Sequence, residues 1–206
     1  SSRAPYGRNL AVRASLGCLR LTYSGLPLNY FFLQFAQVLT AASLFLASFW
    51  VNDQLFEFQV DPTLNWVYLP AGVRLLCILL FGGTGAVGLL FASWYVCFVH
   101  LFPDDLVRAV AGGVIATVAP WLTYRAASRL YGLNVSLCNL TPRRLLVLAF
   151  ACAVARPLLH LLWYALRGQG DLVEGFLVMF VGDLTGTLLV LYGIKALLVG
   201  LPRLAR

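Results

Sequence analysis

Charged side chains are scarce in this chain. Asp, Glu, Lys and Arg make up only 11% of the 206 residues, whereas hydrophobic residues make up 61%. Soluble domains carry about 25% charged and about 45–50% apolar residues, and a soluble core cannot hide so much apolar surface. The composition therefore excludes an ordinary soluble domain and predicts an all-α, polytopic transmembrane helix bundle.

Cysteine patterns and catalytic motifs are also lacking. The five cysteines are odd in number and show no C-x-x-C spacing, so neither a zinc cluster nor a disulfide framework is indicated. No nucleophile elbow, Gly-rich phosphate loop or H-E-x-x-H pattern occurs. We therefore predict a protein without enzymatic activity or a metal site, in which the cysteines are small apolar side chains within helices. They are Cys18, Cys77, Cys97, Cys138 and Cys152.

Apolar stretches long enough to cross a bilayer, about 17–25 residues each, divide the chain into six candidate spans. The boundary between the second and third spans is placed at Gly82 to Gly85, where three glycines in four residues weaken a helix. A re-entrant pair of helices is the alternative there. The six spans are Tyr30–Val51, Asn65–Phe81, Gly85–Phe102, Leu106–Tyr131, Arg143–Leu166 and Leu172–Val199.

Three regions follow from this division. Residues 1–29 mix Arg with Leu and are typical of an amphipathic helix on the cytoplasmic membrane surface. Residues 30–199 form the six-helix transmembrane domain, and residues 200–206 form a short basic tail. No soluble domain is expected beside them.

Basic residues gather on one side of the six-span arrangement, and Lys and Arg in short loops favour the cytoplasmic side. The opposite side carries most of the Asp and Glu, with Arg108 and Arg167 as exceptions. We therefore predict that both termini are cytoplasmic. The preference for Arg over Lys, with abundant Ala, Leu and Gly, indicates a bacterial inner-membrane protein. The basic residues are Arg3, Arg8, Arg13, Arg20, Arg129, Arg143, Arg144, Lys195, Arg203 and Arg206.

The net charge of +7 is explained by this topology and by attraction to anionic lipid headgroups. Nucleic-acid binding is not expected, because no soluble domain offers a basic face. Glycine patterns around Gly82, Gly112 and Gly182 would let helices approach closely, within the chain or with a partner. The expected partners are therefore membrane lipids and either a partner membrane protein or a second copy of the chain.

Three charged residues, Arg74, Arg156 and Asp183, fall well inside the predicted spans. A charge at membrane depth costs roughly 3 kcal/mol on the mildest scale and usually faces a partner, a cavity or a ligand. Counted from the predicted extracytoplasmic ends at about 1.5 Å per residue, the three lie within roughly 3 Å of one level. This permits an Arg–Asp pair, but one Asp cannot neutralise two Arg.

Two interpretations of these charges remain open. The cluster is either a structural ion pair that locks helices together or a ligand-binding cluster. In the second case, the extra positive charge would attract an anionic ligand, a lipid headgroup or a carboxylate of a partner helix.

Two histidines suggest a further alternative. His100 lies near the end of the third span, and His160 lies near the same end of the fifth. A b-type haem would need such an arrangement. Because lone interfacial histidines are commoner, the expectation is that the protein has no cofactor, and haem b is the alternative.

Two short segments resemble elements of a known family. The segments Trp66 to Val73 and Val181 to Gly186 are similar to the W-x-P-A-G and W-x-G-D-x-x-G elements of MASE-type integral membrane sensor domains, and the resemblance covers roughly residues 65–198. Such domains precede diguanylate cyclases and sensor histidine kinases, usually with more spans and a cytoplasmic effector. The resemblance places the following residues at recurring positions of the family: Pro70, Ala71, Gly72, Gly182, Asp183 and Gly186.

The preferred functional prediction combines the resemblance with the buried charges. We expect a non-enzymatic sensor-like membrane protein that acts through a partner, with helix packing around the Arg/Asp cluster as the responsive feature. Two alternatives are kept. One is a substrate-binding subunit of a vitamin-type transporter, and the other is a structural or assembly subunit of a larger membrane complex.

Overall fold

The computed structural model describes residues 27–56, 59–61, 64–131, 142–168 and 172–204. The predicted amphipathic segment at residues 1–29 lies almost entirely outside these ranges, as do Cys18 and Cys138. The described residues are mainly helical, as the composition predicts. The elements are α2 (Pro27–Leu55), β1 (Gln59–Asp61), β2 (Leu64–Asn65), α3 (Leu69–Phe81), α4 (Gly83–Val96), the π-helical segment η1 (Cys97–Leu101), α5 (Leu106–Tyr131), α6 (Pro142–Arg167) and α7 (Leu172–Leu204).

Within the described ranges, five stretches of helix are long and apolar enough to cross a membrane. This finding supports a multi-pass membrane protein. The second predicted span, Asn65–Phe81, is the exception: α3 has 13 residues and is therefore about 20 Å long, against a hydrocarbon core of about 30 Å. The five stretches are Tyr30–Leu55, Gly83–Leu101, Leu106–Leu130, Pro142–Arg167 and Gly175–Leu197.

The start of the second predicted span needs correction. Helix was expected from Asn65, but Leu64 and Asn65 form β2, which pairs antiparallel with β1. Helix α3 begins only at Leu69, with Pro70 in its first turn, where proline costs no hydrogen bond. The predicted break after Phe81 is confirmed, since Gly82 alone joins α3 to α4 with a φ of 59°, a conformation that glycine adopts at little cost.

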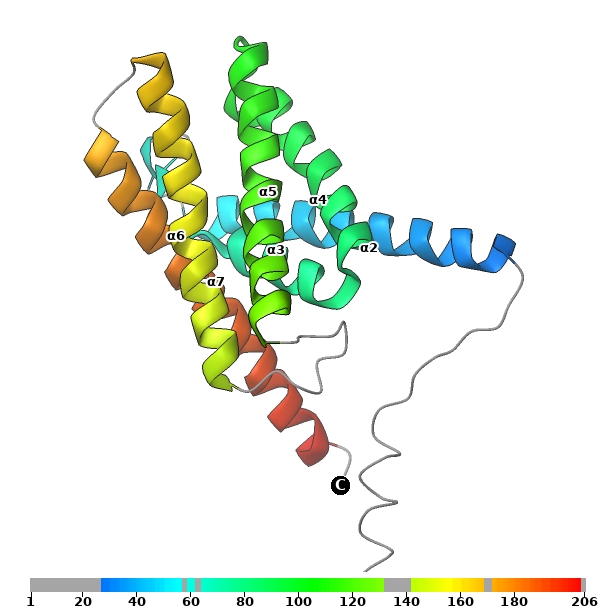
Figure 1. Cartoon of the computed structure of the whole chain (residues 1–206). Helices are drawn as coiled ribbons and strands as arrows, with labels where there is room; N and C mark the ends of the chain where they lie inside the picture. The colour runs from blue at the N-terminus through cyan, green and yellow to red at the C-terminus, as the bar shows by residue number, and fades with distance from the viewer. Residues whose placement is uncertain (1–26, 57–58, 62–63, 132–141, 169–171, 205–206) are drawn as a thin grey trace, which may run out of the picture.

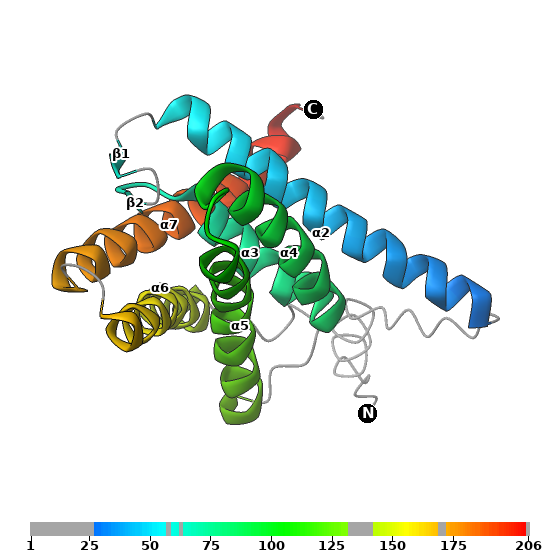
Figure 2. The same cartoon turned by 90° about the horizontal axis from the view of Figure 1, so that it is seen from above.

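Helices α4, α5, α6 and α7 alternate in direction (Figure 1). The end of α4, the start of α5, the end of α6 and the start of α7 lie at one end of this group, and the C-terminal end of α7 lies at the other (Figure 1). Helix α2 instead runs across the group in both views (Figures 1 and 2). The described helices therefore do not form one simple up-and-down bundle.

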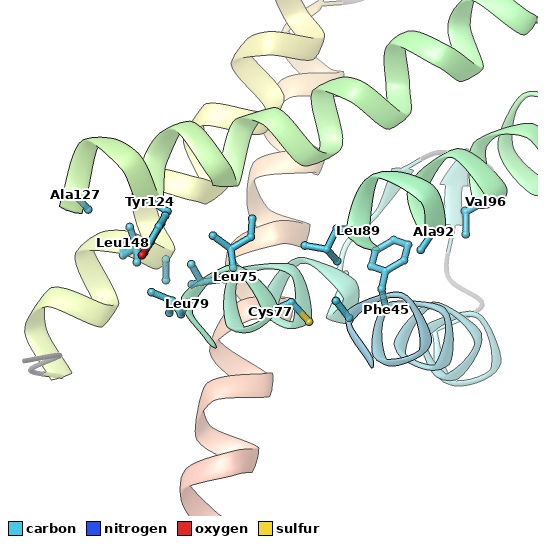
Figure 3. Packing of buried hydrophobic residues seen from close by; sticks show 13 residues of the cluster. Phe45, Leu75, Cys77, Leu79, Leu89, Ala92, Val96, Tyr124, Ala127 and Leu148 are labelled. Carbon is cyan, nitrogen blue, oxygen red and sulfur yellow. The ribbon is translucent and has the colours of Figure 1, made fainter. Parts of the chain in front are cut away.

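The core lies where α3 passes between the other helices (Figure 3). Leu75 of α3 is fully buried at its middle, with Phe45 and Leu89 on one side and Tyr124 and Leu148 on the other (Figure 3). Small residues allow close packing, because a Cβ at Gly88 of α4 would overlap the carbonyl of Val38 in α2. The short helix α3 thus packs against α2 and α4 on one side and against α5 and α6 on the other.

Outward-facing side chains are largely apolar. Near the start of α2, five large apolar side chains within six residues are more than half exposed: Tyr30, Phe31, Phe32, Leu33 and Phe35. An aqueous surface would not tolerate so large a continuous apolar area, whereas lipid does.

The chain leading into α3 packs against the middle of α7. The Tyr68 backbone N–H donates to the Gly182 carbonyl at 3.0 Å, and the Thr185 hydroxyl donates to the Trp66 carbonyl at 2.9 Å. A Cβ at Gly186 would overlap the Tyr68 carbonyl, so this approach requires glycine. The two segments that resemble sensor-domain elements are therefore in direct contact.

Gly186→Ala should lower the free energy of unfolding by about 1–3 kcal/mol, because the added methyl group meets backbone that cannot move aside. Gly193→Ala is the matched control on the same helix, since nothing lies within 4 Å of its added Cβ. The control should be neutral or stabilising by up to about 1 kcal/mol. Thermal unfolding in detergent checks this, and equal unfolding temperatures for the two variants would contradict the packing described.

Candidate functional site

An ion pair between α6 and α7 lies at the centre of the candidate site. Arg156 Nη1 and Asp183 Oδ1 are 2.5 Å apart, and the two side chains are only 15% and 4% exposed. The sequence permitted an Arg–Asp pair without saying which arginine takes part, and in the structure the partner of Asp183 is Arg156. Because both partners are shielded from water, removal of either one would leave an uncompensated buried charge, so α6 and α7 are tied together at this point.

Arg74 approaches the same place from α3. The residue is 4% exposed, and its Nη2 donates to the Tyr68 hydroxyl at 3.3 Å. Its guanidinium carbon lies 4.6 Å from the centre of the Phe45 ring. The Nε and Nη1 atoms of Arg74 are buried without a hydrogen-bond partner among the described residues.

Tyr68 connects the two arginines. Its ring centre lies 5.4 Å from the guanidinium carbon of Arg74 and 4.9 Å from that of Arg156. A cation over an aromatic face contributes about 2 kcal/mol when it is desolvated. Sequence reasoning missed this role of Tyr68. The only signal was an aromatic residue two positions before Pro70, and the sequence carries many such residues.

Two small cavities adjoin the cluster. One has a volume of about 20 Å³ and is lined by all three charged residues together with Ala71, Pro120, Cys152 and Thr187, among others. The second has a volume of about 30 Å³ and is lined by Arg74 and Arg156 with Tyr68, Ser93, His160 and Tyr164, among others. Each is large enough for a water molecule or a small ion, since one water needs about 10–15 Å³ of such space.

The charge of the cluster is unbalanced. Two guanidinium groups meet one carboxylate, which leaves one positive charge, and three guanidinium nitrogens lack a partner among the described residues. These are Nε and Nη1 of Arg74 and Nε of Arg156. Buried donors of this kind are costly unless a partner accepts from them. The arrangement therefore favours an additional acceptor.

The other sequence-predicted motif positions serve packing around this cluster. Pro70 is buried at the start of α3, and Ala71 lines the 20 Å³ cavity. Gly72 lies against α7, where an added Cβ would come within 2.7 Å of Val190. Gly182 accepts the hydrogen bond from Tyr68, and Gly186 allows the close approach beside it. All of these positions are brought together at the contact between α3 and α7.

Two polar residues near the site were not singled out as site residues from the sequence. Asn52 of α2 is 2% exposed, and its Oδ1 accepts from the Leu69 backbone N–H at 2.8 Å, so it holds the start of α3. Arg108 of α5 donates to the Tyr164 hydroxyl at 3.4 Å and lies over the Phe102 ring. Both Tyr164 and Phe102 line the 30 Å³ cavity, so Arg108 is a third guanidinium beside it.

The two histidines do not share a site. His160 is 7% exposed and lines the 30 Å³ cavity, whereas His100 is exposed on η1 beside the rings of Phe49 and Tyr95. A cavity of this size cannot hold a haem. The haem alternative therefore finds no support in this geometry.

Clustered metal ligands and disulfides are both absent from the described ranges. They contain no group of three or more His, Cys, Asp or Glu side chains that could hold a metal ion. Cys77 and Cys97 are buried free thiols, and Cys152 is a half-buried one.

No family model, curated protein or solved structure matches this chain. The resemblance to MASE-type sensor domains therefore stays a prediction. The function has to be inferred from the site itself.

Asp183→Asn should destabilise the protein by about 3–5 kcal/mol, because it leaves buried arginines without their counter-charge. Asp53→Asn, on the exposed end of α2, is the matched control and should change stability little. The double replacement of Arg156 by Met and Asp183 by Leu should cost less than Asp183→Asn alone, since it removes both charges together. Chemical unfolding in detergent measures all three. A loss for Asp183→Asn no larger than for the control would refute the pairing.

Proposed function

We propose that the chain is a non-enzymatic, sensor-like membrane protein that acts through a partner protein. The responsive element is the Arg74/Arg156/Asp183 cluster. A change in what occupies or neutralises the cluster shifts the packing of α3 against α6 and α7. The partner is a second membrane protein or another copy of the chain, in contact with the helix ends.

The observation that carries this proposal is the unbalanced charge at the junction of α3, α6 and α7. A cluster that served only to lock helices would gain most from full neutralisation and full hydrogen bonding, and this one has neither among its described atoms. The position also suits transmission, because Tyr68 contacts both arginines and is hydrogen-bonded through its backbone to α7. A change of charge at Arg74 would therefore affect, through Tyr68, both the contact with Arg156 of α6 and the contact with Gly182 of α7.

We further propose placement in a bacterial inner membrane, with the end of α7 and the N-terminal segment cytoplasmic. The basic residues support this orientation, since the helix ends that carry Arg129, Arg143 and Lys195 belong to the cytoplasmic side by the positive-inside rule. Helices α4 to α7 cross the bilayer, and α3 reaches only part of the way. Anionic lipid headgroups bind the basic side.

The two other candidate functions have less support. A vitamin-type carrier subunit needs a cavity for an organic molecule, and the two cavities at the cluster have volumes of about 20 and 30 Å³. A purely structural subunit accounts for the ion pair but not for the unpartnered guanidinium nitrogens. The cluster therefore favours the sensor-like function.

Reporter fusions test the orientation. Alkaline phosphatase, which is active only outside the cytoplasm, should be active when fused after Asp104 or Gly168, and green fluorescent protein should fluoresce when fused after Leu204. These positions follow from the charge pattern and from the alternation of α4 to α7 (Figure 1). The opposite pattern of activities would overturn the proposed orientation.

Copurification from native membranes tests the function. The wild-type chain should retain a partner protein at fixed stoichiometry, and Arg74→Gln should lose it or change its amount, because the variant alters the charge of the cluster. Arg125→Gln, at an exposed arginine of α5 whose guanidinium lies over the Trp121 ring of the same helix, is the matched control and should behave as wild type. Mass spectrometry of proteins and small molecules gives the result. An unchanged partner set in a folded Arg74→Gln variant would contradict the proposal, and a stoichiometric organic molecule would favour the carrier.

A further inference from the structure

Residues with unpartnered polar atoms gather around one cavity. Six buried side-chain nitrogen and oxygen atoms lack a hydrogen-bond partner among the described residues. Five of the six belong to residues that line the 30 Å³ cavity, and the sixth, Arg108 Nε, belongs to the arginine beside that cavity. The five are Arg74 Nε, Arg74 Nη1, Ser93 Oγ, Arg156 Nε and His160 Nε2. Native proteins rarely leave so many buried polar atoms without partners, so their concentration at one place points to a ligand.

The chemistry of these atoms specifies an acceptor. Guanidinium N–H groups only donate, the Ser93 hydroxyl can donate, and His160 Nε2 donates in one of the two neutral tautomers. Three of the five atoms are guanidinium nitrogens, and the cluster carries one uncompensated positive charge. A cation is therefore repelled, and a neutral water molecule would satisfy donors without balancing the charge. An anion does both.

Size and lining narrow the choice of anion. A volume of about 30 Å³ holds one or two water-sized groups. A single chloride or bromide ion is of this size, whereas phosphate, sulfate and carboxylate-bearing metabolites are larger. The remaining wall is apolar, with Val96, Leu101, Phe102 and Met179. Such a wall suits a weakly hydrated ion better than a strongly hydrated one, because less hydration is lost on binding.

We propose that this cavity binds a single halide ion, chloride or bromide, between Arg74 and Arg156, with Ser93 and His160 as further donors. This proposal rests on the proposed function, because it names the class of ligand to which the Arg74/Arg156/Asp183 cluster responds. A bound halide neutralises the cluster, and its loss leaves the two guanidinium groups to repel one another across Tyr68. Halide occupancy therefore stabilises the packing of α3 against α6 and α7.

Equilibrium binding of radioactive chloride tests the proposal. The full chain is purified in nanodiscs of zwitterionic lipid, in a gluconate buffer free of halide. Binding should saturate at one ion per chain, bromide should compete, and sulfate should not. The wild-type protein should also unfold at a higher temperature in chloride than in gluconate of the same ionic strength, because a ligand of the folded state stabilises it.

Three variants locate the ion. Arg74→Gln should weaken chloride binding by about tenfold or more, the usual loss when a charged hydrogen-bond donor is removed. Ser93→Ala retains every charge and should weaken binding by a smaller factor, about two- to tenfold. Arg129→Gln should bind as wild type. If Arg74→Gln does not fold, Ser93→Ala decides the question alone.

Two results would overturn the inference. One is the absence of saturable chloride binding by folded wild-type protein, which would leave water in the cavity. The other is unchanged affinity in a folded Arg74→Gln variant or, when only Ser93→Ala folds, in that variant. These outcomes are separate from the copurification result. If Arg74→Gln loses the partner and the wild-type protein does not bind chloride, the proposed function stands and the halide site is rejected. If the wild-type protein binds chloride and Arg74→Gln keeps the same partners, the halide site stands and the proposed function is rejected.

Discussion

The contact of one carboxylate with one of two buried arginines is the constraint on which the rest of this structure depends. Asp183 binds Arg156 and thereby joins α6 to α7, and Arg74 is left to satisfy its charge against the rings of Phe45 and Tyr68. In water this imbalance would matter little. Inside a bundle whose surroundings are apolar it is expensive, so the protein either binds a counter-charge or holds the imbalance as a source of conformational response.

The backbone around the cluster is arranged to keep the charged groups close. The segment before α3 lies on α7 because Gly182 accepts from Tyr68 and Gly186 leaves room for its carbonyl. Asn52 holds the other side of the same segment through the Leu69 N–H. Tyr68 is thereby fixed between the arginines. The short helix α3 carries Arg74 at its middle and packs its other faces into the core, so movement at the cluster and movement of the core are coupled.

Sequence patterns predicted part of this arrangement for clear physical reasons. Charges within apolar stretches are conspicuous, so the sequence permitted an Arg–Asp pair, although it did not say that Arg156 rather than Arg74 binds Asp183. Gly82 marked the turn before α4. The hairpin of β1 and β2, the crosswise course of α2 and the role of Tyr68 could not be predicted. They depend on contacts between segments distant in the chain, such as Asn52 with Leu69, and composition within one segment carries no signal for them. The start of the second span was also misplaced, because apolar residues continue from Trp66 to Tyr68 although α3 begins only at Leu69.

The contact between Arg156 and Asp183 can be measured directly in a lipid bilayer. Solid-state nuclear magnetic resonance of protein labelled with ¹⁵N in arginine and ¹³C in aspartate measures this through the dipolar coupling of the guanidinium nitrogen to the carboxyl carbon. The structure predicts a strong coupling that disappears in Arg156→Gln and remains in Arg129→Gln. A wild-type spectrum without that coupling, or one in which it survives in Arg156→Gln, would contradict the account.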